Sequence, residues 1–302
     1  MTLMKNILLG MAVGDAFGVP FEFLSREEAG RRVTESMQGW GTHHQPPGTW
    51  SDDTSLALCT ADAMVKDYSV SKVARNFVKW LDEGLWTPHG TVFDIGGTTR
   101  DAINRLRSGV DPMLAGGQDE MDNGNGSLMR ILPVLWYFEQ KGHYDVRTVA
   151  ELSSLTHGHP RSMTACVTLV RFAQLILYHG KEKAFDVFRK EVKENLFTQD
   201  EQAAHFSRLP HLDELPESEI QSGGYVIHTL EASIWCLLKT SSYKDAVLKA
   251  VRLGDDTDTT ACVTGGLAGI AYGWESIPDE WLTSLARKDE IMGLCERLES
   301  GG

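Results

Sequence analysis

The chain has 302 residues, 42% of them hydrophobic, and its 42 acidic and 29 basic side chains give a formal net charge of −13. This length and composition can supply a sizeable core, which excludes disorder as the default, and the acidic balance argues against nucleic acid as the main partner. The five cysteines are widely spaced without any CxxC pair, which excludes a disulfide framework and a thiolate zinc site and predicts a reducing, cytoplasmic location.

The first predicted element is a buried helix within residues 1–18, "MTLMKNILLGMAVGDAFG". The segment resembles a weak signal peptide, but Gly10, Gly14 and Asp15 interrupt its apolar run too early. No run in the chain approaches the roughly 18 apolar residues that a bilayer span needs, so no membrane segment is expected.

Apolar residues recur at helical spacing in the rest of the chain, and alternating strand patterns are nearly absent. Further helices are predicted over 69–83, where Ser71 is expected to begin the helix, 161–180, preceded by Pro160, 224–240, and 278–298, begun by Pro278, Asp279 and Glu280. The small residues of 264–273 predict a helix that packs closely on another. Long polar connections over 37–53, 84–97, 109–127 and 195–224 are typical either of functional loops or of poorly ordered segments. The pattern predicts one mostly α domain over residues 1–302.

Two acidic clusters each precede an apolar helix. Asp52 and Asp53 form the first, and the second, within "GDDTDTTAC", holds Asp255, Asp256 and Asp258. Either cluster alone is compatible with ordinary helix capping. Together they hold more acid than capping needs, and carboxylate and hydroxyl oxygens select a hard cation such as Mg²⁺, Mn²⁺ or Ca²⁺.

Two glycine-rich stretches, "FDIGGTTRDAI" (93–103) and "MDNGNGSLMR" (121–130), stand at predicted helix starts, the second near Ser127. Backbone amides at such a start can bind phosphate, although glycine and asparagine are also ordinary turn formers. With the acidic clusters, they predict a phosphate-bearing substrate. His43, His44 and Trp50 precede the first cluster, where a cleft-lining role and a solvated turn both remain open.

Together these residues resemble the ADP-ribosylglycohydrolase family. The motifs that carry the resemblance are "GMAVGDAFGVPFEF", "GTWSDDTSLAL", "FDIGGTTRDAI", "GNGSLMRILPV", "LTHGHP", "GGYVIHTLEASIWC" and "LGDDTDTTACVTGGLAGIAYG". The resemblance implies a compact, all-α, single-domain orthogonal helical bundle with a two-metal cleft that holds two divalent cations, Mg²⁺ or Mn²⁺.

The family's metal ligands fall on Ser51, Asp52, Asp53, Asp256, Asp258 and Thr259. Glu22, Asp53, Asp256 and Asp94 are the expected catalytic residues, with Glu22 or a metal-ligating aspartate handling the proton and Asp94 near the target side chain. The expected substrate contacts are Asp94, Gly124, Asn125, Gly126, Ser127, Met129, His157 and Tyr225. Asp255 stands where many members have glycine and is expected to have only a local role.

The resemblance implies hydrolysis of the glycosidic bond between ADP-ribose and an acceptor, with arginine on a protein the leading choice. Serine-linked ADP-ribose, O-acetyl-ADP-ribose and other small conjugates remain alternatives. A non-hydrolytic ADP-ribose-binding module and a Mg²⁺-dependent phosphoesterase that cuts the pyrophosphate are rival functions. The expected partners are an ADP-ribosylated protein or conjugate and the product ADP-ribose, without nucleic acid or membrane, and the protein is expected to be a monomer.

Overall fold

The computed structural model describes residues 3–194 and 202–300, and within these ranges it contains fourteen α-helices and no β-strand. The helices are α1 (Leu3–Gly18), α2 (Arg26–Arg32), α3 (Asp52–Asp62), α4 (Val70–Glu83), α5 (Gly97–Arg107), α6 (Val134–Lys141), α7 (Val146–Ser154), α8 (Pro160–His179), α9 (Lys181–Lys193), α10 (Val226–Leu238), α11 (Tyr243–Arg252), α12 (Thr257–Tyr272), α13 (Asp279–Ser284) and α14 (Lys288–Glu299). The expectation of a compact, all-α fold is confirmed.

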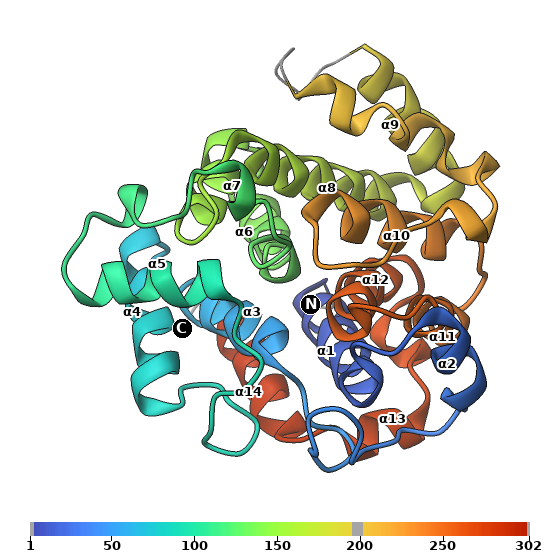
Figure 1. The fold of residues 1–302 in the computed structure, drawn as a ribbon. Helices are drawn as coiled ribbons and strands as arrows, with labels where there is room; N and C mark the ends of the chain where they lie inside the picture. Colours follow the sequence, from blue (N-terminus) through green and yellow to red (C-terminus); the bar gives the residue numbers. More distant parts are fainter. Residues whose placement is uncertain (1–2, 195–201, 301–302) are drawn as a thin grey trace.

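Two helices from opposite ends of the chain form the centre of the fold. Figure 1 shows α1 and α12 side by side, with α2 and α11 on one side of them and α3, α4 and α5 on the other. Nearly every residue of α1 and α12 is buried. The predicted buried first helix and the predicted close packing of the small-residue helix are therefore both confirmed.

Three predicted helix boundaries were wrong. Ser69, rather than Ser71, caps α4, and its side chain accepts a hydrogen bond from Lys72 N. The segment 278–298 is two helices, α13 and α14, because Leu285 is extended and Arg287 takes the left-handed region with φ 48°. The segment after the second glycine loop is only a short 3₁₀ helix, η4 (Leu128–Arg130), rather than an α-helix.

Two of the four long connections contain short 3₁₀ helices. The 109–127 connection contains η2 (Pro112–Leu114) and η3 (Glu120–Asp122). The predicted 195–224 connection lies partly outside the described residues, and its described part contains η5 (Ala203–Phe206), η6 (Leu209–Glu214) and η7 (Glu217–Glu219). These short 3₁₀ helices give the two connections local order.

In the part of the chain that the structure describes, no single helix has the length and apolar character to cross a membrane. One pair of segments joined at a sharp bend, Leu3–Phe21 and Arg26–Arg32, meets the requirement by length and composition only.

Candidate active site

Backbone contact between α1 and α12 positions the second acidic cluster. A Cβ placed on Gly14 would lie 2.1 Å from the carbonyl oxygen of Ala261, and one on Gly18 would lie 2.5 Å from the Cα of Asp258. Thr257 Oγ1 donates a hydrogen bond of 2.8 Å to the carbonyl oxygen of Gly18. Because glycine leaves room for a facing backbone, the first turn of α12 lies directly against the end of α1.

Asp15, near the end of α1, fixes the start of α3 and with it the first acidic cluster. Its carboxylate accepts hydrogen bonds from Ser51 N at 2.9 Å, Thr54 N at 3.0 Å and Thr54 Oγ1 at 2.6 Å. Burial raises the pKa of Asp15 to about 7, although these hydrogen bonds act in the opposite direction. Sequence reasoning missed this residue. The sequence feature that could have revealed it is a single acid within an otherwise apolar helix, because a buried carboxylate needs hydrogen-bond donors.

The two acidic clusters meet in the interior of the protein. Ser51 Oγ and Thr259 Oγ1 both donate to Asp53 Oδ2, at 3.0 and 3.2 Å, so a hydroxyl from each helix start contacts the same carboxylate. The oxygens Asp53 Oδ1, Asp256 Oδ1 and Asp258 Oδ2 are buried and have no hydrogen-bond partner among the described residues. The fold therefore gathers carboxylate oxygens that the protein itself leaves unsatisfied.

Burial and mutual repulsion disfavour the charged forms of these acids. Burial, and then the charges of Asp15 and Glu22 respectively, raise the pKa of Asp53 and Asp258 well above its usual range. Carboxylate oxygens of Glu22, Asp256 and Asp258 lie within 4.8 Å of one another. Buried, like-charged carboxylates are unfavourable unless protons or a cation compensate them. Their oxygens fit a hard divalent cation such as Mg²⁺ or Mn²⁺.

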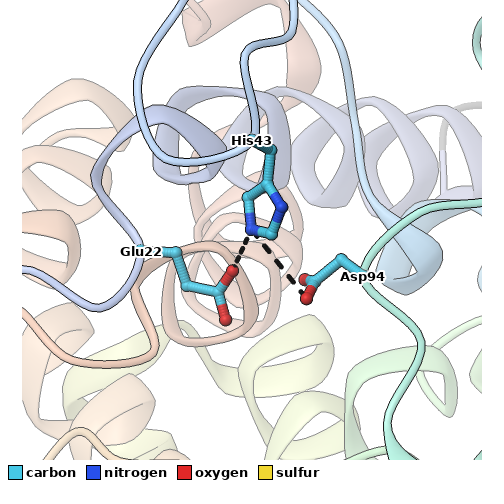
Figure 2. Close-up of side chains that lie close together, drawn as sticks. All are labelled: Glu22, His43 and Asp94. Atoms are coloured by element: carbon cyan, nitrogen blue, oxygen red, sulfur yellow. Dashed lines mark hydrogen bonds and ion pairs between the residues drawn. The ribbon is translucent and has the colours of Figure 1, made fainter.

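A second group of side chains joins this cluster on the side of Glu22. His43 Nε2 hydrogen-bonds Glu22 Oε2 and lies 3.9 Å from Asp94 Oδ1 (Figure 2). Burial raises the pKa of Glu22 to about 7, and the hydrogen bond that His43 donates to the Glu22 carboxylate raises the pKa of His43. Sequence reasoning had left His43 undecided. The other two residues left undecided do not join this group. His44 is exposed, and Trp50 is buried and donates a hydrogen bond from its Nε1 to Trp86 O.

A cavity of about 230 Å³ opens beside these acids. Its walls are formed by Glu22, Asp52, Asp53, Asp94, Gly96, Gly97, Thr98, Thr99, Met121, Gly124, Asn125, Gly126, Met129, His157, Gly224, Asp256 and Thr259. Residues 96–99 form the start of α5, where the capping residue Gly96 makes no side-chain cap hydrogen bond. The first amides of α5 are thus available to an anion, and the helix dipole favours one there.

His157 faces this cavity as a neutral ring. Burial, followed by the nearby charge of Arg130, lowers its pKa to about 3. Thr156 Oγ1 lies 2.8 Å from His157 Nδ1 and also accepts a hydrogen bond from Arg130 Nη2 at 2.8 Å. In the tautomer in which the threonine hydroxyl donates to Nδ1, the imidazole proton lies on Nε2. That atom lies 3.5 Å from the space a Cβ on Gly124 would take. His157 Nε2 therefore faces the cavity beside the second glycine loop, and in this tautomer it is an N–H donor.

Tyr225 lies in an adjoining hollow of about 550 Å³, which shares Met121, Gly124 and Gly224 with the cavity. An isolated β-bridge pairs Tyr225 with Gly124. The guanidinium of Arg161 lies 5.8 Å from the centre of the tyrosine ring. This half-buried ring, next to the glycine loop, offers an aromatic face outside the acidic part of the site.

Three of the predicted site residues stand behind the cavity wall. Ser51 Oγ donates a hydrogen bond to Asp53, and the carboxylate of Asp258 lies close to those of Glu22 and Asp256. Ser127 is fully buried, and its hydroxyl accepts a hydrogen bond from Ser153 Oγ at 2.9 Å and contacts Cys166 Sγ at 3.4 Å. Ser127 is therefore not among the residues that form the cavity wall.

Asp255 differs from the two acids that follow it in the sequence. It is exposed and takes the left-handed region with φ 57°, which glycine adopts most easily. Its backbone N donates to Leu24 O at 2.8 Å, and its carbonyl accepts from Phe23 N at 2.7 Å. The main chain of Asp255 thus holds the segment that carries Glu22.

Comparison with known proteins identifies the family. The model of the ADP-ribosylglycohydrolase family matches residues 3–302. The chain is 36% identical over 304 residues to ADP-ribosylarginine hydrolase Tri1 of Serratia proteamaculans, covering 97% of this chain and 78% of that protein. It is 31% identical to ADP-ribosyl-[dinitrogen reductase] glycohydrolase of Rhodospirillum rubrum over 288 residues, covering 93% of this chain and 90% of that protein.

A solved structure described as an ADP-ribosylglycohydrolase-related protein complex superimposes with a TM-score of 0.82 at 29% identity, covering 99% of this chain and 98% of its own. The fold, the two joined acidic clusters and these similarities agree along nearly the whole chain. The chain therefore belongs to the ADP-ribosylglycohydrolase family.

Proposed function

We propose that this protein hydrolyses the N-glycosidic bond between ADP-ribose and an arginine side chain of a modified protein, and that it needs two divalent cations, Mg²⁺ or Mn²⁺. The observation that carries the proposal is the set of buried, unpartnered oxygens of Asp53, Asp256 and Asp258 beside a cavity with two glycine-rich walls. The relatives named for ADP-ribosylarginine support arginine as the acceptor.

The acids and hydroxyls of the two helix starts would hold the cations: Ser51, Asp52, Asp53, Asp256, Asp258 and Thr259. When bound there, the cations would lower the pKa of water and neutralise charge next to the ribose. Asn125 Nδ2 donates a hydrogen bond of 2.8 Å to Asp256 Oδ2, which leaves the other oxygen of that carboxylate for a cation. The second glycine loop is in this way linked to the acidic cluster.

The remaining walls suit the rest of ADP-ribose. The amides at the start of α5, the backbone of Gly124–Gly126 and the Nε2–H of His157 would bind the pyrophosphate oxygens. Tyr225 would stack on the adenine, because aromatic faces bind purines well. Met129, on the cavity wall, would contact the ribose beside the loop.

Glu22 and Asp94 would act at the acceptor end of the bond. Asp94 would pair with the guanidinium leaving group through its carboxylate. Glu22, whose pKa burial raises to about 7, can exchange a proton near neutral pH. Positive charge develops on the ribose as a glycosidic bond breaks, and nearby carboxylates stabilise it.

The test is turnover of two defined peptides, one ADP-ribosylated on arginine and one on serine, with Mg²⁺, with Mn²⁺ and after chelation. The expected result is cation-dependent release of ADP-ribose from the arginine peptide. Serine-peptide turnover alone would transfer the proposal to that acceptor, and the products AMP and ribose phosphate would identify a phosphoesterase. Tight ADP-ribose binding without release would identify a binding module.

Two neighbouring aspartates provide a matched pair of variants for this assay. Asp256→Asn should lower kcat/KM by about a hundredfold or more, because it removes a carboxylate from the cation site. Asp255→Asn changes an exposed side chain and keeps a residue that tolerates the left-handed region, so it should leave turnover near that of the parent protein. Equal activity in the two variants would contradict the cation assignment.

A further inference from the structure

The imidazole of His43 lies between two pairs of residues, and each pair consists of an acid and an aromatic residue that are adjacent in the sequence. One pair is Glu22 and Phe23, and the other is Phe93 and Asp94. His43 Nε2 hydrogen-bonds Glu22 and lies 3.9 Å from Asp94 Oδ1 (Figure 2). Its ring centre lies 6.1 Å from that of Phe23 and 5.4 Å from that of Phe93. One planar ring thus contacts two carboxylates and two aromatic rings.

The backbone on both sides of this ring is held in an uncommon conformation. Phe23 has φ 64° and Asp94 has φ 55°, values that few residues other than glycine adopt. Such conformations persist where the surrounding structure enforces them, and they cluster at binding sites. The two pairs are therefore presented by fixed backbone.

The loop that carries His43 is fastened to the segment of Glu22. Thr42 Oγ1 donates a hydrogen bond of 2.7 Å to the carbonyl oxygen of Glu22, and Thr42 N donates one of 3.2 Å to that of Pro20. A Cβ placed on Gly41 would lie 1.8 Å from the same Pro20 oxygen, so the two backbones touch. The main chain at residue 43 is thereby fixed, and rotation of the His43 side chain would uncover both acids without moving the loop.

Two carboxylates and two aromatic rings around one planar ring are surroundings that suit a guanidinium. Guanidinium is planar, pairs with carboxylates through several N–H groups and stacks on aromatic faces. Glu22 and Asp94 also line the cavity described above, whereas His43 approaches them from the loop side. The ring of His43 therefore occupies a place that is chemically suited to the acceptor side chain.

We propose that His43 is a specificity-determining residue that occupies the acceptor subsite as an internal substitute for guanidinium, and that an arginine side chain displaces it. This inference rests on the proposed arginine acceptor. A planar cation regains the contacts that His43 gives up, whereas a neutral acceptor cannot regain the pairing with both carboxylates. His43 thus makes entry to the subsite conditional on a guanidinium.

The direct test measures binding of ethylguanidinium to the Mg²⁺-loaded protein by calorimetry, with ethylurea as the neutral planar control. While His43 occupies the subsite, only the fraction of protein with His43 displaced can bind ethylguanidinium, and the apparent affinity is reduced in proportion to that fraction. His43→Ala should therefore bind ethylguanidinium about tenfold more tightly than the parent protein, the ratio expected from releasing one hydrogen bond to a charged group. Binding of ethylurea should not change.

Three further variants make the result specific. His44→Asn is the matched control, because it alters the exposed neighbouring histidine and asparagine tolerates its φ of 53°; it should bind ethylguanidinium as the parent does. Asp94→Asn combined with His43→Ala should lose the gain. His43→Gln, which keeps an N–H donor toward Glu22 but no ring, should gain less than His43→Ala and covers the case in which the alanine variant fails to fold.

Unchanged or weaker ethylguanidinium binding in both folded His43 variants would overturn the proposal. With the arginine-linked peptide, His43→Ala should lower KM, whereas a merely structural role would lower kcat and leave KM unimproved. The proposed function is tested separately by turnover in the parent protein. If the parent protein shows no turnover but His43→Ala binds ethylguanidinium more tightly, the proposed reaction is rejected and the proposed subsite is retained. If the parent protein turns over the arginine peptide but His43→Ala does not bind ethylguanidinium more tightly, only the proposed subsite is rejected.

Discussion

The contact between α1 and α12 predicts opposite effects for two glycine-to-alanine substitutions. Gly14 and Gly30 both lie within helices, where alanine is favoured over glycine by about 1 kcal/mol. A Cβ on Gly14 would meet the backbone oxygen of Ala261 at 2.1 Å, whereas a Cβ on Gly30 would meet nothing within 4 Å. The two substitutions therefore share a propensity gain and differ in packing.

The packing change at Gly14 should outweigh the gain. Atoms at 2.1 Å are more than 1 Å inside ordinary contact, and the carbonyl of Ala261 belongs to a helix backbone, so α1 and α12 must separate. Overpacking of this kind costs about 1–3 kcal/mol, and the rigid backbone puts Gly14→Ala at the upper end. The net loss in unfolding free energy should be about 2 kcal/mol, against a gain of up to about 1 kcal/mol for Gly30→Ala.

Thermal unfolding followed by helical circular dichroism measures this difference. At roughly 2–4 °C per kcal/mol for a chain of this size, Gly14→Ala should unfold about 4–8 °C below the parent protein. Ala261 lies one helical turn from Asp258, so the same variant should also bind Mn²⁺ more weakly, which Gly30→Ala should not. A Gly14→Ala protein as stable as Gly30→Ala would refute the close-contact reasoning.

Three other outcomes follow from the site. Asp15→Asn replaces an acceptor oxygen with a donor opposite Ser51 N and Thr54, so denaturant titration should find it destabilised by about 1–3 kcal/mol. His157, with a pKa near 3 in the folded protein and 6.5 as its reference value, favours folding when neutral, so stability is present above about pH 6.5 and is lost as pH falls toward 3. At about pH 5.5 the loss should be about 1.4 kcal/mol, and it should vanish in His157→Gln; equal pH dependence of the two unfolding midpoints would contradict a buried neutral ring. Mn²⁺ at about a hundred times its Kd should stabilise the parent protein by about 2.7 kcal/mol and Asp256→Asn far less, and an equal rise in both melting temperatures would count against the cation site.

The helices and the acidic clusters could be predicted from the amino-acid sequence, because both depend on residues that are close together in the chain. Helical spacing predicted a mostly α fold, and small residues predicted the close packing of α12. The acids of "WSDDT" and "GDDTDTT" exceeded what two helix caps need, which pointed to a cation before any fold was known. The sequence did not fix the start of α4, since Ser69 and Ser71 are both good caps and the structure has the cap at Ser69.

The contacts between side chains that are distant in the sequence could be seen only in the folded protein. Asp15 contacts residues 36 and 39 positions away, and His43 contacts Glu22 across 21 positions, so no local pattern could separate these residues from an ordinary buried acid or a solvated turn. The hydroxyl of Ser127 turned to the core because Ser153 and Cys166 contact it there. Local sequence sets the conformation of each segment, but the direction and partners of a side chain depend on how closely distant helices pack, and here that closeness comes from the glycines of α1 against the backbone of α12.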